Sequence, residues 1–96
     1  MSIDFEWDLN KAAINLRKHG VTFEEAATVF RDELSATVPD PDHSLDEDRF
    51  ITVGVSSENR LLIVAHSEYG DSIRIISARE LTPRERRQYG EASWGG

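Results

Sequence analysis

The chain has 96 residues, a formal net charge of −7 at pH 7 and no cysteine. Disulfides and thiolate chemistry are therefore excluded, and non-specific nucleic-acid binding is disfavoured, because such binding normally needs a broadly basic surface. At this length we expect one domain over residues 1–91, followed by a frayed tail over residues 92–96. No apolar run approaches about 18 residues, and the N-terminus does not resemble a signal peptide. We therefore expect a cytoplasmic protein with no membrane segment.

The positive charge is distributed unevenly along the chain. The first 48 residues carry four basic and twelve acidic side chains. Residues 49–96 carry seven basic side chains, all of them arginine: Arg49, Arg60, Arg74, Arg79, Arg84, Arg86 and Arg87. A guanidinium can bind one phosphate through two parallel hydrogen bonds. The distribution indicates a protein that meets phosphate at a local site and not through a general positive field.

The first elements are predicted at residues 3–7 and from about residue 9 to His19. Apolar and acidic residues alternate over 3–7, which is the period of a short strand with one buried face. Asp8 or Asn10 can cap the helix that follows, and Gly20 supplies the left-handed residue that ends it. Apolar residues occur in this helix at helical spacing: Leu9, Ala13 and Leu16.

A second helix is predicted to begin at Thr22. Thr22 and Glu25 have the spacing of a capping box, in which the hydroxyl and the carboxylate each accept a hydrogen bond from the other residue's backbone N–H. A buried stripe is expected along this helix, made of Phe23, Ala26, Ala27 and Phe30.

Residues 39–48 form an acidic segment with two prolines and no glycine. It contains oxygen and nitrogen donors at close spacing: Asp40, Asp42, His43 and Glu47. Their spacing does not fit an EF-hand loop, which needs ligands at fixed alternate positions and a central glycine. We expect a solvated loop with no metal and no cofactor, in which His43 or Glu47 reaches a neighbouring site.

Three runs rich in isoleucine and valine follow, at about Arg49–Ser56, Leu61–Glu68 and Ser72–Glu80. Short turns at 57–60 and 69–71 separate them, and turns of this length indicate consecutive antiparallel hairpins.

The last helix is predicted to begin with a second capping box, formed by Thr82 and Glu85, with Pro83 at the first helical position. It is expected to run to about Glu91. The predicted order is therefore β-α-α-β-β-β-α, which is an α+β domain with helices packed on an antiparallel sheet.

The turn lengths also predict which side chains face one another. Pairing Glu68 with Ser72 places His66 opposite Arg74, and the preceding hairpin then places Ile51 opposite His66. Four polar side chains are expected at one end of one face: Arg49, His66, Glu68 and Arg74. The rest of that face is expected to be apolar: Ile51, Val53, Val55, Leu62, Val64 and Ile76. A one-residue bulge would move some of these side chains to the other face.

Two interpretations of the polar cluster are open. In the first, Arg74 and Glu68 form a surface ion pair worth about 0–1 kcal/mol. In the second, the cluster is a phosphodiester site. RNA cleavage without a metal needs a group of near-neutral pKa to move the 2′-OH proton and cations to stabilise the charge on the phosphorane. His66 would carry the proton, and Arg49, Arg74 and Arg79 would bind the phosphate.

Two further groups are open to a structural or a functional interpretation. On the last helix, Arg86 and Tyr89 share a side, with Arg87 next to them. The Tyr89 ring either packs on the sheet or stacks on an unpaired base. Lys18 and His19 either complement the macrodipole at the end of the first helix or belong to the site.

Six segments together resemble, in the same order, the BrnT family of type II toxins. They span residues 5–89: FEWD (5–8), NLRKHGVTFEEA (15–26), DPDHS (40–44), EDRF (47–50), RIISAR (74–79) and ERRQY (85–89). The resemblance implies a RelE-like ribonuclease toxin fold and a cytoplasmic toxin that cleaves RNA and inhibits translation. It also implies a BrnA-like ribbon-helix-helix antitoxin as partner, with operator DNA bound only indirectly, through the antitoxin.

The resemblance assigns functional residues by motif position. The candidate catalytic residues are His19, Glu47, Arg49, Arg74, Arg79 and Tyr89, to which the hairpin pairing adds His66. The candidate RNA-binding residues are Lys18, Arg86 and Arg87. The alternative function is a non-catalytic partner-binding module, or a co-repressor that acts with a ribbon-helix-helix DNA-binding protein.

Overall fold

The computed structural model describes residues 3–43, 45 and 48–95, with side chains through residue 90. In chain order, the elements are β1 (Asp4–Glu6), α1 (Leu9–His19), α2 (Phe23–Thr28), the 3-10 turn η1 (Val29–Arg31), β2 (Ala36–Pro39), the 3-10 turn η2 (Pro41–His43), β3 (Arg49–Val55), β4 (Leu61–Tyr69), β5 (Ser72–Glu80) and α3 (Pro83–Gly95).

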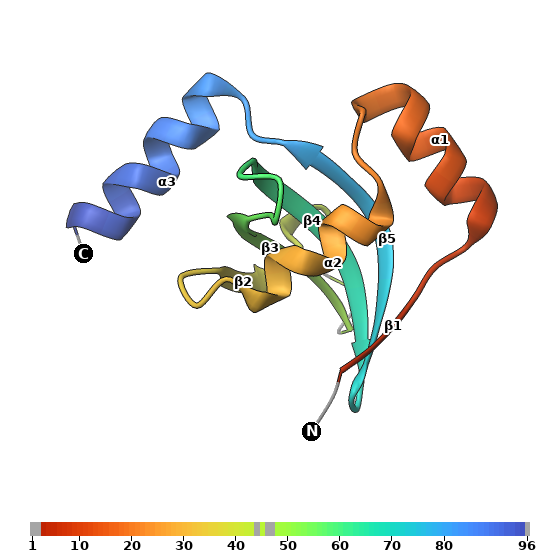
Figure 1. Ribbon diagram of the computed structural model, residues 1–96. Helices are drawn as coiled ribbons and strands as arrows, with labels where there is room; N and C mark the ends of the chain where they lie inside the picture. Colours follow the sequence, from red (N-terminus) through yellow and green to blue (C-terminus); the bar gives the residue numbers. More distant parts are fainter. Residues whose placement is uncertain (1–2, 44, 46–47, 96) are drawn as a thin grey trace.

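Five strands form one curved sheet in the order β1-β5-β4-β3-β2 (Figure 1). The two long hairpins are antiparallel as predicted, and the α+β fold is confirmed. Two features differ from the expected order. β1 pairs with β5 in parallel, and a short edge strand, β2, precedes the acidic loop and pairs with β3. No helix in the described part of the chain is both long and apolar enough to span a membrane.

Helix α1 begins and ends where the sequence predicts. The Asp8 carboxylate accepts from the backbone N–H of Lys11 at 3.0 Å, and Gly20 ends the helix with a φ of 70°. The apolar side chains of this helix are largely exposed, and its buried residue is Asn15. The Asn15 amide bonds both the N–H and the C=O of Ala78 at 3.0 and 2.8 Å. It thereby satisfies the backbone hydrogen-bonding groups of Ala78, which lies beyond the residues of β5 that pair with β1.

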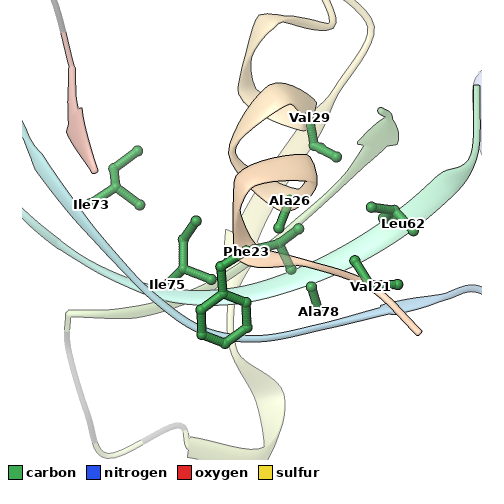
Figure 2. Packing of buried hydrophobic residues seen from close by; sticks show 9 residues of the cluster. Val21, Phe23, Ala26, Val29, Leu62, Ile73, Ile75 and Ala78 are labelled. Carbon is green, nitrogen blue, oxygen red and sulfur yellow. The ribbon is translucent and has the colours of Figure 1, made fainter. Parts of the chain in front are cut away.

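The hydrophobic core lies between α2 and one face of the sheet (Figure 2). The helix ends at Thr28 and continues as the 3-10 turn η1, which adds Val29 to the buried stripe. Phe23 and Ala26 are fully buried as expected, whereas Ala27 and Phe30 are partly exposed. The buried apolar residues of this core are Val21, Phe23, Ala26, Val29, Leu62, Val64, Ile73, Ile75 and Ala78.

Only half of the predicted capping box at α2 forms. The Thr22 hydroxyl accepts from the N–H of Glu25 at 3.0 Å, but the Glu25 carboxylate does not return to Thr22. It accepts instead from the Ser56 hydroxyl at 2.6 Å and from Nε and Nη2 of Arg60. Arg60 also donates to the C=O of Gly20 at 3.0 Å. This ion pair lowers the pKa of Glu25 and joins α2 to the β3–β4 turn.

The predicted register of the β4–β5 hairpin is wrong by one residue near the turn. Tyr69, not Glu68, pairs with Ser72, so that Ser67 lies opposite Arg74 and His66 lies opposite Ile75. The predicted count assumed a three-residue turn, whereas the actual turn contains two residues and Gly70 has a φ of 58°. A shift of one residue exchanges the two faces of a strand, because side chains alternate.

The β3–β4 hairpin is displaced by one residue in the same way. His66 lies opposite Phe50, and Ile51 lies opposite Ala65. His66 is therefore on the core face and Arg49 is on the other face, together with Ile51. The expected grouping of Arg49, His66, Glu68 and Arg74 on one face does not occur; Arg49 and Arg74 share a face, and His66 and Glu68 lie on the opposite one.

A β-bulge interrupts the pairing of β5 with β4. Ala65 pairs with Ser77 and His66 pairs with Ile75, which leaves Ile76 as the extra residue. The alternation of side chains therefore reverses once within β5. Ile73, Ile75 and Ala78 face the core, whereas Arg74, Ser77 and Arg79 share the outer face, which lies opposite α2.

The capping box of α3 is complete. The Thr82 hydroxyl accepts from the N–H of Glu85 at 3.2 Å, and the Glu85 carboxylate accepts from the N–H of Thr82 at 2.9 Å. The helix follows the end of β5 and lies on the other side of the picture from α1 (Figure 1). It reaches Gly95, beyond the expected end near Glu91. Fraying of residues 92–96 remains a prediction.

We predict that Glu25→Gln lowers the free energy of unfolding at pH 7 by about 1–3 kcal/mol, because the partly exposed Arg60 guanidinium loses its buried counter-charge. The folded-state pKa of Glu25 is lowered, so this contribution is present above the unfolded pKa and is lost as the pH falls. Urea unfolding at pH 7 measures the effect. Glu24→Gln, an exposed change in the same turn, is the control. Equal stability of the two variants would contradict the prediction.

Candidate functional site

An open pocket of about 360 Å³ lies on the outer face of the sheet. We call it the outer pocket. Its floor is formed by Ile63 and Ala65 of β4, whose neighbours Leu62 and Val64 face the core. Its full lining comes from residues 40–43, β3, β4, β5 and the first turn of α3: Asp40, Pro41, Asp42, His43, Arg49, Ile51, Ile63, Ala65, Ser77, Arg79 and Glu85. Apolar strand residues thus form the base, and charged residues form the rim.

Arg79 is held at the rim by Glu85. Its Nη1 and Nη2 donate to the two oxygens of Glu85 at 2.7 and 3.0 Å, and Nη1 also lies 3.2 Å from the C=O of Glu80. Hydrogen bonding to Arg79 is the main cause that lowers the pKa of Glu85, to about 2, and the same contact raises the pKa of Arg79. The cap of α3 therefore also orients this guanidinium.

Arg49 and His43 both contact Asp40. His43 Nδ1 lies 3.1 Å from Asp40 Oδ2, and Arg49 Nη2 lies 3.8 Å from the same oxygen. The Arg49 contact is longer than a hydrogen bond. Its Nε is buried and has no hydrogen-bond partner among the described residues. Arg49 is therefore less fully satisfied by these neighbours than Arg79.

The rim of the outer pocket carries charges of both signs, with one more carboxylate than guanidinium. Two guanidiniums face three carboxylates, those of Asp40, Asp42 and Glu85, with His43 beside them. A phosphate that binds there has to compete with Asp40 and Glu85 for the arginines. A phosphate group can make the same bidentate contact as a carboxylate, so an exchange of this kind is chemically matched.

His66 does not line the outer pocket. It is 0% exposed on the core face, where Nε2 lies 2.7 Å from the Thr52 hydroxyl and the ring contacts Phe30 and Phe50. Nδ1 lies 3.4 Å from a Glu68 oxygen but makes no hydrogen bond within the described residues. Burial lowers the pKa of His66 to about 4. These contacts indicate a structural role, and the pairing of His66 with Arg74 that suggested a catalytic role does not form.

The other candidates on the strands and on α1 lie outside the lining of the outer pocket. Arg74 lies on the same face as Arg49, across Ser67, and its Nη1 is 3.6 Å from Glu6 of β1. It is not part of the pocket lining that the structure describes. Lys18 and His19 line a separate hollow of about 160 Å³, which shares Ser77 with the outer pocket.

The candidates on α3 lie elsewhere. Tyr89 and Arg86 line a third hollow, of about 600 Å³, between α3 and the ends of β3 and β4. The Tyr89 hydroxyl donates to the C=O of Leu34 at 3.1 Å, and Arg86 Nη2 lies 3.6 Å from Glu80. Arg87 is exposed on the same helix.

Glu47 lies outside the described residues. Within the described part of the chain, no group of three or more histidine, cysteine, aspartate or glutamate side chains is arranged to hold a metal ion.

The sequence did not identify Asp40 and His43 as a pair. They are three residues apart, a separation that a 3-10 turn brings together, and Asp-Pro at 40–41 is a turn signal that could have indicated it. The sequence also could not place Glu85 against Arg79, because the corner between β5 and α3 decides that contact.

The comparisons with known proteins agree with one family. Residues 7–85 match the model of the ribonuclease toxin, BrnT, of type II toxin-antitoxin systems. The crystal structure of the Brucella abortus ribonuclease toxin BrnT is similar, with a TM-score of 0.66 and 20% sequence identity, over 84% of this chain and 99% of that one. At this identity the similarity shows a shared fold. No curated protein matches the sequence significantly.

We predict that acidification destabilises the fold through His66. Its folded-state pKa is about 4, below the ordinary 6.5, so between these values the unfolded chain binds a proton that the folded chain does not. Stability is therefore full above about pH 6.5 and falls by up to about 3 kcal/mol by pH 4, since one pKa unit corresponds to about 1.4 kcal/mol.

The test compares chemical unfolding of the parent protein and His66→Gln between pH 7 and pH 4. Glutamine can keep a hydrogen bond to Thr52 but does not titrate. The parent should lose more stability than the variant over this range, and equal losses would show that His66 is not the titrating group.

Proposed function

Because the chain belongs to the BrnT family of ribonuclease toxins of type II toxin–antitoxin systems, we propose that it is an endoribonuclease that cleaves RNA in the outer pocket without a metal ion. The single observation that carries the choice of site is the convergence of Arg49 and Arg79, from two different strands, on one open pocket. Guanidiniums stabilise the negative charge that develops on a phosphorane.

The proposed reaction uses the RNA's own 2′-OH as the nucleophile. Its oxygen attacks the adjacent phosphorus while its proton is removed, and the bond from phosphorus to the 5′-oxygen breaks. The 5′-oxygen takes up a proton, so the products are a cyclic phosphate and a 5′-hydroxyl. This chemistry needs proton transfer and charge stabilisation, which side chains alone can supply. Arg49 and Arg79 would bind the scissile phosphate. Contacts with its oxygens would replace their present contacts with Asp40 and Glu85.

The surroundings of the pocket support a path for a single RNA strand. Ser77 joins the outer pocket to the hollow with Lys18 and His19, and Arg74 lies on the same face beyond Ser67. These cations would contact flanking phosphates, which adds salt-dependent affinity. Arg86, Arg87 and Tyr89 on α3 would contact RNA beyond the pocket, and the Tyr89 contact to Leu34 suits a positioning role better than a chemical one.

Membership of a type II toxin family implies an antitoxin partner. We propose that this partner is a BrnA-like ribbon-helix-helix protein. Its acidic side chains would cover the outer face of the sheet, where Arg49, Arg74 and Arg79 lie. The pair would repress its own operon, with operator DNA bound through the antitoxin alone. The free toxin would act in the cytoplasm, where cleavage of RNA inhibits translation.

We predict that Arg49→Ala and Arg79→Ala each lower the rate of RNA cleavage by about 10²–10³-fold, the effect of removing one donor to a developing oxyanion. Cleavage of a defined single-stranded RNA by the purified protein, with EDTA present, measures this rate. Arg74→Ala and Tyr89→Phe belong in the same series, and growth arrest on expression is the second readout.

The matched control is Arg31→Ala, an exposed arginine of η1 away from the outer pocket. Thermal unfolding of each variant separates loss of chemistry from loss of fold. Cleavage that survives both pocket substitutions at the parental rate would remove the site assignment. A pure parent protein that cuts no RNA would favour the non-catalytic module or co-repressor.

We also predict that the product of a neighbouring ribbon-helix-helix reading frame co-purifies with the toxin and abolishes its RNA cleavage. Because the antitoxin is proposed to cover the outer pocket, Arg49→Ala and Arg79→Ala should weaken this complex, while Arg31→Ala should not. Calorimetric titration of the two purified proteins measures the difference. Equal affinity for all three variants would place the antitoxin elsewhere on the toxin.

A further inference from the structure

We infer that His43 is the catalytic residue that carries the proton in this pocket, and that Asp40 is the residue that positions it. The inference rests on the proposed ribonuclease function and assigns a role that the sequence had given to His66. It follows from the geometry at η2, where a partly exposed imidazole is hydrogen-bonded to a buried carboxylate beside two arginines.

Asp40 is fixed on several sides. It is 6% exposed, its N–H bonds the C=O of Arg49 at 3.1 Å, and its C=O accepts from the N–H of His43 at 3.1 Å. One carboxylate oxygen, Oδ1, accepts from the N–H of Asp42 at 3.0 Å. The other, Oδ2, is left for the His43 ring and for Arg49. The carboxylate is therefore a rigid acceptor whose position is set by the end of β2 and the start of β3.

This contact defines the tautomer of His43. When Nδ1 carries a hydrogen and donates to Asp40, the lone pair is on Nε2, the nitrogen on the other side of the ring. A carboxylate that holds an imidazole in one tautomer, and stabilises the imidazolium that forms, is the arrangement that makes histidine an effective general base. The side chain is 44% exposed, so substrate can reach it.

The neighbouring charges suit this role. His43 faces Asp40 and Asp42 on its own segment, Arg49 on β3, and Arg79 with Glu85 from β5 and α3. Asp40 contacts both the imidazole and Arg49, so a phosphate bound by Arg49 would be next to the ring. The other two histidines do not combine these features. His66 is fully buried on the core face, and His19 lines a different hollow.

Neutral His43 takes the proton from the 2′-OH through Nε2 as the 2′-oxygen bonds to phosphorus. The bond to the 5′-oxygen breaks, and the leaving oxygen takes a proton from solvent. The imidazolium then returns its proton to solvent, and no oxidant, reductant or metal is required.

The experiment measures cleavage of a defined RNA by the full-length protein across pH 5–9, with EDTA, for the parent, His43→Ala and Asp40→Asn. His43→Ala should be slower by about 10²–10⁴-fold, the range for loss of a general base, with little change in KM. It should also lose the rise in rate with pH that the parent shows on the acid side. Added imidazole should restore part of the rate to His43→Ala and none to Arg79→Ala.

Asp40→Asn preserves the size of the side chain and removes its charge. It should lower kcat and shift the acid side of the pH profile, which a smaller folded fraction would not do, because loss of folded protein lowers kcat without moving the profile. Arg31→Ala, measured in parallel, is the control for differences in preparation between variants. If the parent cleaves RNA and His43→Ala keeps its rate and its acid limb, the assignment of His43 is overturned while the ribonuclease function stands. If the parent cleaves no RNA, the proposed function itself fails and the assignment falls with it.

Discussion

The β-bulge at Ile76 is the constraint on which the outer pocket depends. A regular strand would alternate without interruption, and Arg74 and Arg79, five residues apart, would then face opposite sides of the sheet. The extra residue reverses the alternation once. As a result, Ile73, Ile75 and Ala78 all reach the core, while Arg74, Ser77 and Arg79 all reach the outer face. One strand therefore contributes to both the stability of the domain and its candidate site.

The acidic character of the chain has a specific consequence at this site. Arg79 is already bound by Glu85, and Arg49 is near Asp40, before any ligand arrives. These carboxylates hold the guanidiniums in place, which lowers the entropy that binding would otherwise cost. They also lower the affinity of the pocket for weakly binding anions, because a ligand has to replace a carboxylate that already binds the guanidinium through two hydrogen bonds. Local arginine pairs and an overall charge of −7 are thus compatible with selective phosphate binding.

Buried polar contacts connect the pieces of this small domain. Asn15 joins α1 to the open edge of β5, and the Glu25–Arg60 pair joins α2 to the β3–β4 turn. The hydroxyls of Thr37 and Thr52 and the ring of His66 form a further chain across β2, β3 and β4. A 96-residue chain has a limited apolar core, and contacts of this kind fix how the elements are placed. Glu85 does the same at the pocket, since it caps α3 and orients Arg79.

Local chemistry along the chain was sufficient for the features that depend on neighbours three or four residues away. The Asp8 cap, the left-handed Gly20, the hydroxyl half of the cap at Thr22 and the complete box at Thr82 all follow from the sequence. The positions of β1, β3, β4 and β5 and the family resemblance follow from it as well, and so does the choice of Arg49 and Arg79 as candidates. The caps and strands each depend on residue types within a single segment, and the resemblance depends on six such segments in order.

Only the tertiary structure decided which side chains meet across segments. Register depends on how each turn closes and on where a bulge occurs, and an error of one residue moves a side chain to the opposite face. For that reason His66 lies in the core. The Glu25 carboxylate contacts Arg60, from a distant turn, in place of the backbone at its own helix cap. The pairing of His43 with Asp40 beside Arg49 likewise exists because η2 folds back against the start of β3. The three-residue separation of Asp40 and His43 fits a 3-10 turn, but no spacing along the chain places that pair beside Arg49.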